Sequence, residues 1–201
     1  MAHIQLRENL SALSAAEAQE MTIFLCGHAP SVRSVVVSVA PSHWTDLDYD
    51  SRDVLKACSV DGQACLLNFR FPNGRAEHSG LQETWIRTAH GVMILYSTGD
   101  RDSFNEAEAH RDRVVRIKDY DAPLDAPIVL LSTVPPDAER EVSQQEGREL
   151  ALALGCPGFE TPADALDQDA LDACFCTLIR EIKKKQVSRP VYPQRKKCLV
   201  M

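Results

Sequence analysis

The chain is expected to fold as an α/β domain in which helices cover a largely parallel sheet. Two features of its 201 residues predict this class. From residue 21 onward, short β-rich apolar runs alternate with segments of helical periodicity, the order typical of parallel sheets. The last helical segment, 168–185, also carries a continuous apolar stripe at helical spacing, so one of its faces is expected to lie in a core.

Six short segments have the composition of strands. They are 22–26, 54–60, 64–69, 92–97, 128–132 and a short run near Phe159. The pair Asp61-Gly62 separates the second strand from the third, and it favours a two-residue hairpin turn because glycine tolerates a positive φ. These two strands are therefore expected to pair antiparallel, and the other strands to run parallel.

Helical patterns fill the remaining intervals. They cover about 33–40, 81–89, 102–118, 139–154 and 168–185. Gly155 follows the fourth helix and is expected to cap it in the left-handed conformation. The predicted organisation is an N-terminal extension (1–20), one domain (21–185) and a flexible basic tail (186–201).

Charge is distributed unevenly along the chain, whose formal net charge is −7. Residues 183–201 contain seven Lys or Arg residues and no acid, which leaves the rest of the chain strongly acidic. No nucleic-acid partner is expected for such an acidic body, because nucleic acids are bound mainly through cationic contacts to phosphate.

The seven cysteines are scattered and show no spacing typical of a zinc site. No metal site and no disulfide framework are therefore expected, and the composition suits a reduced, cytosolic protein. Cys26 followed by His28 could suggest a nucleophile and its base, but Cys26 ends an apolar strand and is better interpreted as a packed thiol. No stretch has the length and apolarity of a signal peptide or a transmembrane helix.

The C-terminus reads Cys198-Leu199-Val200-Met201, which matches the prenylation motif C-a-a-X, with methionine favouring a farnesyl group. The basic residues upstream are Lys183, Lys184, Lys185, Arg189, Arg195, Lys196 and Lys197. One prenyl chain anchors a protein only reversibly, and a basic patch adds about 1 kcal/mol per residue of attraction to anionic lipids. We expect lipidation at Cys198 and attachment to the anionic cytoplasmic face of the plasma membrane, with a cytosolic pool.

A strand followed at once by a glycine and then a helix is the place where a parallel α/β sheet can bind phosphate. The octapeptide at this place is Gly27, His28, Ala29, Pro30, Ser31, Val32, Arg33 and Ser34. Compared with G-x-x-x-x-G-K-[ST], only its first glycine and its last hydroxyl residue match. Val32 replaces the second glycine and Arg33 replaces the lysine, so the octapeptide alone is a weak motif.

Other stretches make the chain similar to a Ras-family small GTPase. They are Val60-Asp61-Gly62-Gln63-Ala64-Cys65-Leu66-Leu67, Trp85-Ile86-Arg87-Thr88-Ala89-His90-Gly91-Val92, Asp102-Ser103-Phe104, Pro127-Ile128-Val129-Leu130 and Leu178-Ile179-Arg180-Glu181-Ile182. With the C-a-a-X end, the resemblance covers roughly residues 21–201. It implies a three-layer fold with a six-stranded, mostly parallel sheet, one antiparallel edge strand and about five helices, and it implies signalling at the inner plasma membrane.

The segments that the resemblance aligns with the nucleotide-binding boxes depart from the family pattern. Pro30 has no N–H to offer a phosphate. Phe71 replaces the magnesium-organising carboxylate of D-x-x-G, in which Gly74 is retained, and Arg75 replaces the water-orienting glutamine. The guanine boxes read Thr133-Val134-Pro135-Pro136 and Pro162-Ala163-Asp164. The chain thus lacks the magnesium-organising carboxylate, the guanine-binding carboxylate and one amide of the phosphate loop. At about 1.5–3 kcal/mol each, these losses weaken nucleotide binding by about 5–9 kcal/mol.

The resulting hypothesis is a Ras-like pseudo-GTPase with weak or lost GTP binding, no hydrolysis, no catalytic residue and no resident cofactor. The alternative is a divergent small GTPase that binds GTP or GDP and Mg²⁺ and hydrolyses slowly. In that alternative Arg33, Ser34 and Gly74 hold the nucleotide and the Ser34 hydroxyl contacts Mg²⁺.

Protein effectors or regulators are expected to bind through the 43–53 and 71–90 loops. Trp44 and Trp85 are the candidate contact residues, because exposed aromatic side chains often anchor interfaces. For Trp44, a ring folded onto the edge of the domain is an equally good interpretation.

Overall fold

The computed structural model describes residues 18–40, 54–72, 79–119, 126–164 and 166–187. The described strands form a six-stranded sheet of order β2-β3-β1-β4-β5-β6. They are β1 (Gln19–Gly27), β2 (Val54–Val60), β3 (Gln63–Arg70), β4 (Gly91–Ser97), β5 (Ile128–Val134) and β6 (Gly158–Pro162). The helices are α1 (Ala29–Val39), α2 (Ser79–Thr88), α3 (Arg101–Asp119), α4 (Gln144–Leu154) and α5 (Gln168–Val187).

Strand pairing confirms the predicted fold class. Edge strand β2 pairs antiparallel with β3, and the other four pairings are parallel. The turn between β2 and β3 is Asp61-Gly62, with φ of 54° and 77°. This is the left-handed region that a two-residue hairpin turn requires, so the predicted hairpin is confirmed.

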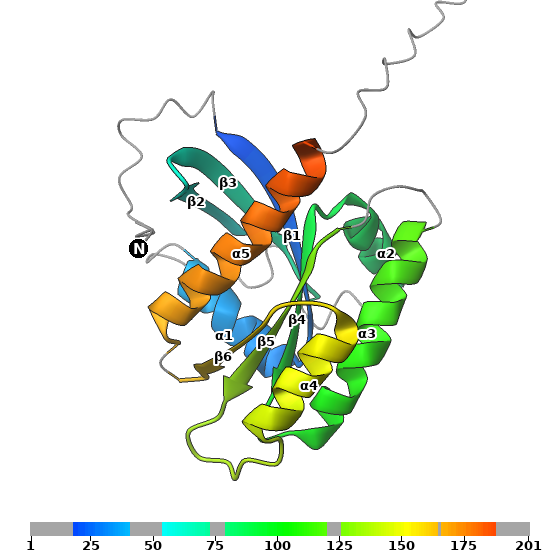
Figure 1. Ribbon diagram of the computed structural model, residues 1–201, viewed down its shortest axis with the longest axis vertical. Helices are drawn as coiled ribbons and strands as arrows, with labels where there is room; N and C mark the ends of the chain where they lie inside the picture. The colour runs from blue at the N-terminus through cyan, green and yellow to red at the C-terminus, as the bar shows by residue number, and fades with distance from the viewer. Residues whose placement is uncertain (1–17, 41–53, 73–78, 120–125, 165, 188–201) are drawn as a thin grey trace, which may run out of the picture.

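Helices cover both faces of the sheet (Figure 1). Helices α1 and α5 pack on one face, where Phe69 of β3 meets Phe175 of α5 with ring centroids 5.5 Å apart. Helices α2 and α3 pack on the other face, where Phe24 of β1 lies 6.5 Å from Trp85 of α2. The predicted apolar stripe of α5 is buried throughout: Leu171, Phe175, Leu178, Ile179 and Ile182.

The starts of β1 and α4 differ from the sequence prediction for clear physical reasons. Strand β1 begins at Gln19, because Gln19 and Glu20 pair with Cys65 and Leu66 of β3 through backbone groups that need no apolar side chain. Helix α4 begins at Gln144 rather than 139. Ser143 closes a reciprocal capping box with Glu146 there, which satisfies the free N–H groups of the first turn.

The predicted end of α4 is confirmed. Gly155 adopts the left-handed conformation at the C-cap, with φ 65°, and its N–H donates to the carbonyls of Ala151 and Leu152.

Candidate nucleotide site

The carboxyl ends of the parallel strands meet at one edge of the sheet, and the sequence-predicted boxes gather there. Gly27 ends β1, Phe71 follows β3, Thr98 follows β4 and Thr133 lies at the end of β5. Backbone hydrogen bonds join them: Thr98 N–H donates to Thr133 O at 2.9 Å, and Ala163 N–H donates to Val134 O at 2.8 Å. The fold therefore assembles the place where an α/β domain binds ligands.

Gly27 is required here by the approach of β4. Its φ is +108°, and a Cβ at this position would lie 2.0 Å from the carbonyl oxygen of Leu95. The N–H of His28 donates to the same oxygen at 2.8 Å. The first glycine of the octapeptide thus has a steric role, because it lets β1 leave the sheet close against β4.

The predicted start of the first helix, at 33, is wrong, because α1 begins at Ala29. Pro30 lies in the first turn, where its fixed φ suits a helix and its missing N–H has no partner to lose. The N–H of Val32 donates to His28 O at 3.0 Å, and the side chains of Ser31 and Val32 are buried. Most of the octapeptide therefore forms the beginning of a helix.

A chain of polar side chains ties the start of α1 to β5. Ser31 Oγ lies 2.7 Å from His28 Nδ1 and 2.5 Å from Thr133 Oγ1, and Thr133 Oγ1 donates to Tyr96 O at 3.4 Å. These contacts satisfy the buried hydroxyls of Ser31 and Thr133 internally. In the family pattern, Thr133 occupies the first position of the guanine box.

His28 also faces a carboxylate, with its Nε2 3.6 Å from Asp100 Oδ2. Burial lowers the pKa of His28 below its ordinary value, more than Asp100 raises it. Burial therefore favours the neutral form of His28, whose ring lies beside the Asp100 carboxylate.

The two octapeptide residues that keep family-like chemistry lie one turn further along α1. Arg33 is exposed and Ser34 is partly exposed. Across the ranges that the structure describes, no group of three or more His, Cys, Asp or Glu side chains is arranged to hold a metal ion.

Phe71 stands where the family places its magnesium-organising carboxylate. Its side chain is fully buried in the core shared with α1, together with Val32 and Val35. The position therefore faces the interior of the domain. Gly74, the retained glycine of that box, lies outside the described residues.

The segment after β5 closes against the β4–α3 turn. A Cβ at Gly99 would lie 2.8 Å from Pro135 Cγ, and the N–H groups of Glu141 and Val142 donate to Thr98 O at 2.8 and 2.9 Å. Asp137, the acid nearest to the guanine box, is exposed on this segment. The prolines thus direct the chain across the end of β4.

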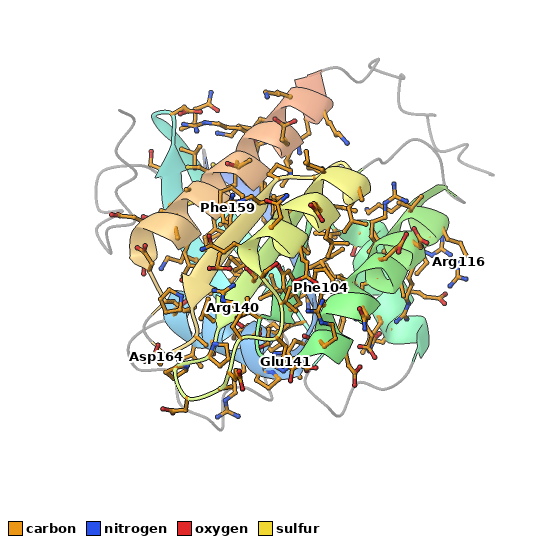
Figure 2. The ribbon with its side chains drawn as sticks, turned by 60° about the horizontal axis from the view of Figure 1, so that its bottom comes forward. Phe104, Arg116, Arg140, Glu141, Phe159 and Asp164 are labelled. Carbon is orange, nitrogen blue, oxygen red and sulfur yellow. The ribbon has the colours of Figure 1, made fainter. Side chains whose placement is uncertain are left out.

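Two ion-pair clusters brace this end of the molecule, and sequence analysis did not identify them. Arg101 at the start of α3 pairs with Glu146 of α4 at 2.6 Å, and its backbone N–H donates to Glu141 Oε2 at 2.9 Å. Arg140 makes a bidentate contact to Glu160 of β6, at 3.0 and 2.8 Å. Figure 2 shows Arg140 and Glu141 in the segment that leads into α4. The capping-box spacing of Ser143 and Glu146 was the feature of the sequence that pointed to the cluster of Arg101 and Glu146.

A hollow of about 510 Å³ lies between α4 and strands β5 and β6, away from the octapeptide. Tyr96, Ser132, Arg148 and Phe159 are among its lining residues, and none of residues 27–34 is. No sequence motif marked this hollow.

Two expectations about single residues can be decided. Trp85 was a candidate contact residue, and this is wrong: its side chain is 5% exposed and packs in the core against Phe24, because the apolar face of α2 lies on the sheet. The interpretation of Cys26 as a packed thiol is confirmed, since its side chain is buried in the core with Phe24 and Trp85, and this burial raises its pKa to about 12.

Most of the predicted membrane-binding elements lie outside the described residues. These are Cys198, Arg189, Arg195, Lys196 and Lys197. The 43–53 loop with Trp44, predicted to bind protein partners, also lies outside the described residues. Of the basic residues at the end of α5, Lys183 donates to Val60 O at 3.4 Å and so belongs partly to the fold. Lys184 pairs with Glu181. Among the helices of the described ranges, none has the length and apolarity needed to cross a membrane.

Comparison with known proteins decides the family. The model of the Ras family matches residues 48–184. The chain belongs to the Ras family. It is also 32% identical over 162 residues to a "Ras-like protein" from Laccaria bicolor, an alignment that covers 78% of this chain and 75% of the relative.

Proposed function

We propose that this Ras-family chain is a signalling protein that acts mainly by binding other proteins, with GTP binding weak or lost and hydrolysis absent. The conformation of the octapeptide carries the proposal. A phosphate loop presents consecutive free backbone N–H groups to the ligand. Here Pro30 has no N–H, and the N–H of Val32 is used within α1. The family match, which begins at residue 48, does not include the octapeptide.

The residues present do not fit a magnesium-bound nucleotide. Magnesium prefers oxygen ligands in octahedral geometry, and Phe71 offers a buried aromatic ring where the family has a carboxylate. The hydroxyl of Ser34 is the one ligand type retained in the octapeptide. A phosphate beside neutral His28 would also be repelled by Asp100, 3.6 Å from the ring.

Release of bound nucleotide from the purified protein tests this proposal. The protein is denatured and the supernatant chromatographed, with a nucleotide-binding Ras protein prepared in parallel as the positive control. We expect far less than one guanine nucleotide per chain. A stoichiometric yield of GDP or GTP would refute the proposal and support the alternative of a slow GTPase using Arg33 and Ser34.

A thermal-shift titration with GDP and Mg²⁺ gives a second measurement. A ligand at a thousandfold excess over its Kd stabilises the folded state by about 4 kcal/mol. That corresponds to a rise in Tm of about 8–16 °C for a domain of this size. We expect no rise at millimolar GDP with Mg²⁺, and a magnesium-dependent rise would contradict the proposal.

We also propose that Cys198 is prenylated and that the protein is held at the anionic cytoplasmic face of the plasma membrane. The C-a-a-X ending and the seven basic residues of 183–201 support this. Cys198→Ser should move the protein from the membrane fraction to the soluble fraction of cells. Cys156→Ser, which changes a partly exposed thiol elsewhere, is the matched control. Unchanged fractionation of Cys198→Ser would remove the lipid proposal.

The partner surface is proposed at 43–53, 71–90 and the adjoining edge strand β2. Leu55 of β2 supports this, because its side chain is 51% exposed at the sheet edge directly after the 43–53 segment. A partner retained by the immobilised wild type should be lost with Leu55→Glu. It should be retained with Val37→Glu, which changes an equally exposed residue of α1. Equal loss in both variants would argue against this surface.

A further inference from the structure

Three cysteine side chains meet between the β2–β3 hairpin and α5, at the amino end of β3 and far from the octapeptide edge. Cys58 of β2 and Cys65 of β3 are direct partners across the antiparallel pair. Cys176 of α5 is buried in the same core cluster, and its thiol lies close enough to interact electrostatically with Cys65. All three are free thiols.

The surroundings of Cys65 favour its thiolate. Cys58 faces Cys65 across the strand pair, the ammonium of Lys183 on α5 lies close enough to interact electrostatically with Cys65, and the Cys65 thiol donates to Gln63 O at 3.5 Å. The interaction with Cys58, followed by the charge of Lys183, lowers the pKa of Cys65 below its ordinary value despite burial. The interaction with Cys65, together with burial, raises the pKa of Cys58. Cys65 is thus the nucleophilic member of the pair and Cys58 the protonated one.

The hairpin is held firmly against α5 at this point. Arg180 makes a bidentate contact to Asp61 of the turn, at 2.9 and 2.6 Å, and Lys183 donates to Val60 O at 3.4 Å. A hollow of about 10 Å³ lies beside the thiols between edge strand β2 and α5, lined among others by Cys58 and Cys176. A space of this size admits about one water-sized molecule.

We propose that Cys65 and Cys58 form an oxidant-sensitive dithiol that hydrogen peroxide converts to a cross-strand disulfide. Direct partners across an antiparallel pair have Cα atoms about 4.5–5.5 Å apart, within the range of about 4.4–6.8 Å that disulfides span. The bond can therefore form without separating the strands, and it would covalently join the edge strand to β3.

The reaction has two balanced steps. The Cys65 thiolate attacks one peroxide oxygen, an S–O bond forms, the O–O bond breaks, and the departing hydroxide takes up a proton to become water. Cys58 then attacks the sulfenic sulfur of Cys65, the S–S bond forms, the S–O bond breaks, and the oxygen leaves as a second water with the proton of Cys58. Two sulfurs lose one electron each, and peroxide is reduced to two waters.

Mass spectrometry of the folded, full-length protein tests the inference. After treatment with hydrogen peroxide, the remaining thiols are alkylated and the protein is digested with trypsin. Cleavage after Lys56 and Arg70 leaves Cys58 and Cys65 in one peptide, 57–70. We expect this peptide to lose two hydrogen atoms and to resist alkylation until it is reduced. A peptide that stays doubly alkylated after peroxide treatment, or a Cys65–Cys176 bridge, would overturn the inference.

Variants distinguish the roles of the two thiols. Cys58→Ala should leave a sulfenic acid at Cys65 that a 1,3-dicarbonyl probe captures, whereas Cys65→Ala should abolish capture. Lys183→Met should slow disulfide formation about tenfold near pH 6, because it removes the charge that favours the thiolate. Cys174→Ala changes a buried thiol of α5 and should have no effect. Equal capture in the Cys65→Ala variant would assign the reactivity to another residue and refute the inference.

Discussion

Replacing Phe71 with aspartate reinstates the family carboxylate and tests whether this position faces a ligand site or the core. Phe71 is fully buried among residues of α1 and its neighbours. Truncating a buried phenylalanine costs about 3–5 kcal/mol, and a carboxyl group buried without a partner adds about 1–3 kcal/mol. The sum, about 4–8 kcal/mol, is comparable with the whole stability of an ordinary domain, about 5–15 kcal/mol.

Urea unfolding followed by circular dichroism measures this loss. We expect Phe71→Asp to be largely unfolded, or to have a much lower urea midpoint. Phe71→Leu, which keeps an apolar side chain in the space, should lose less than about 1.5 kcal/mol. If Phe71→Asp kept the wild-type midpoint and gained magnesium-dependent GDP binding, the side chain would face a nucleotide pocket and the reasoning would be refuted.

Two further predictions concern stability. Gly27→Ala should destabilise the fold by well over about 1 kcal/mol, because φ is +108° and Leu95 O would lie 2.0 Å from the new Cβ. Gly62→Ala, in open space at φ +77°, should cost only about 1 kcal/mol. Equal urea midpoints for the two variants would contradict the steric argument. Arg101 and the capping bonds of Ser143 lower the pKa of Glu146 from about 4.5 to about 2, so its ionised form stabilises the fold above about pH 4.5 and this contribution is lost as the pH falls to about 2. Glu146→Gln should therefore lower the urea midpoint at pH 7 and leave it unchanged at pH 2, and the same loss at both pH values would exclude the charge effect.

Local patterns predicted most of the fold. The apolar stripe of α5 and the Asp61-Gly62 turn are patterns of a few neighbouring residues. They therefore predict a helix and a hairpin without knowledge of the tertiary arrangement. The helix starts were less predictable. Ser143 and Glu146 have the spacing of a capping box, yet the helix was expected to begin at about 139. The start of α1 was missed because Pro30 was considered for a phosphate loop, whereas it also suits the first turn of a helix.

The candidate site likewise has features that the sequence predicts and features that depend on the fold. That Phe71 and Pro30 lack the groups a nucleotide needs follows from their chemistry alone. That Ser31 bonds to Thr133, across 102 positions of sequence, required the strands to be brought together. The burial of Trp85 had the same origin, since a tryptophan on a short amphipathic helix can face either a partner or a core.

The amino-acid sequence by itself determined the alternation of strands and helices, the single antiparallel hairpin and the residue types at each box, because these depend on neighbouring residues or on side-chain chemistry. Only the tertiary structure decided which of those residues touch. Packing made Phe71 a core residue, placed Asp100 beside His28, and brought the charge of Lys183 close to Cys65. Contacts of this kind join elements that are distant in sequence, so their free energies are set by how sheet and helices pack.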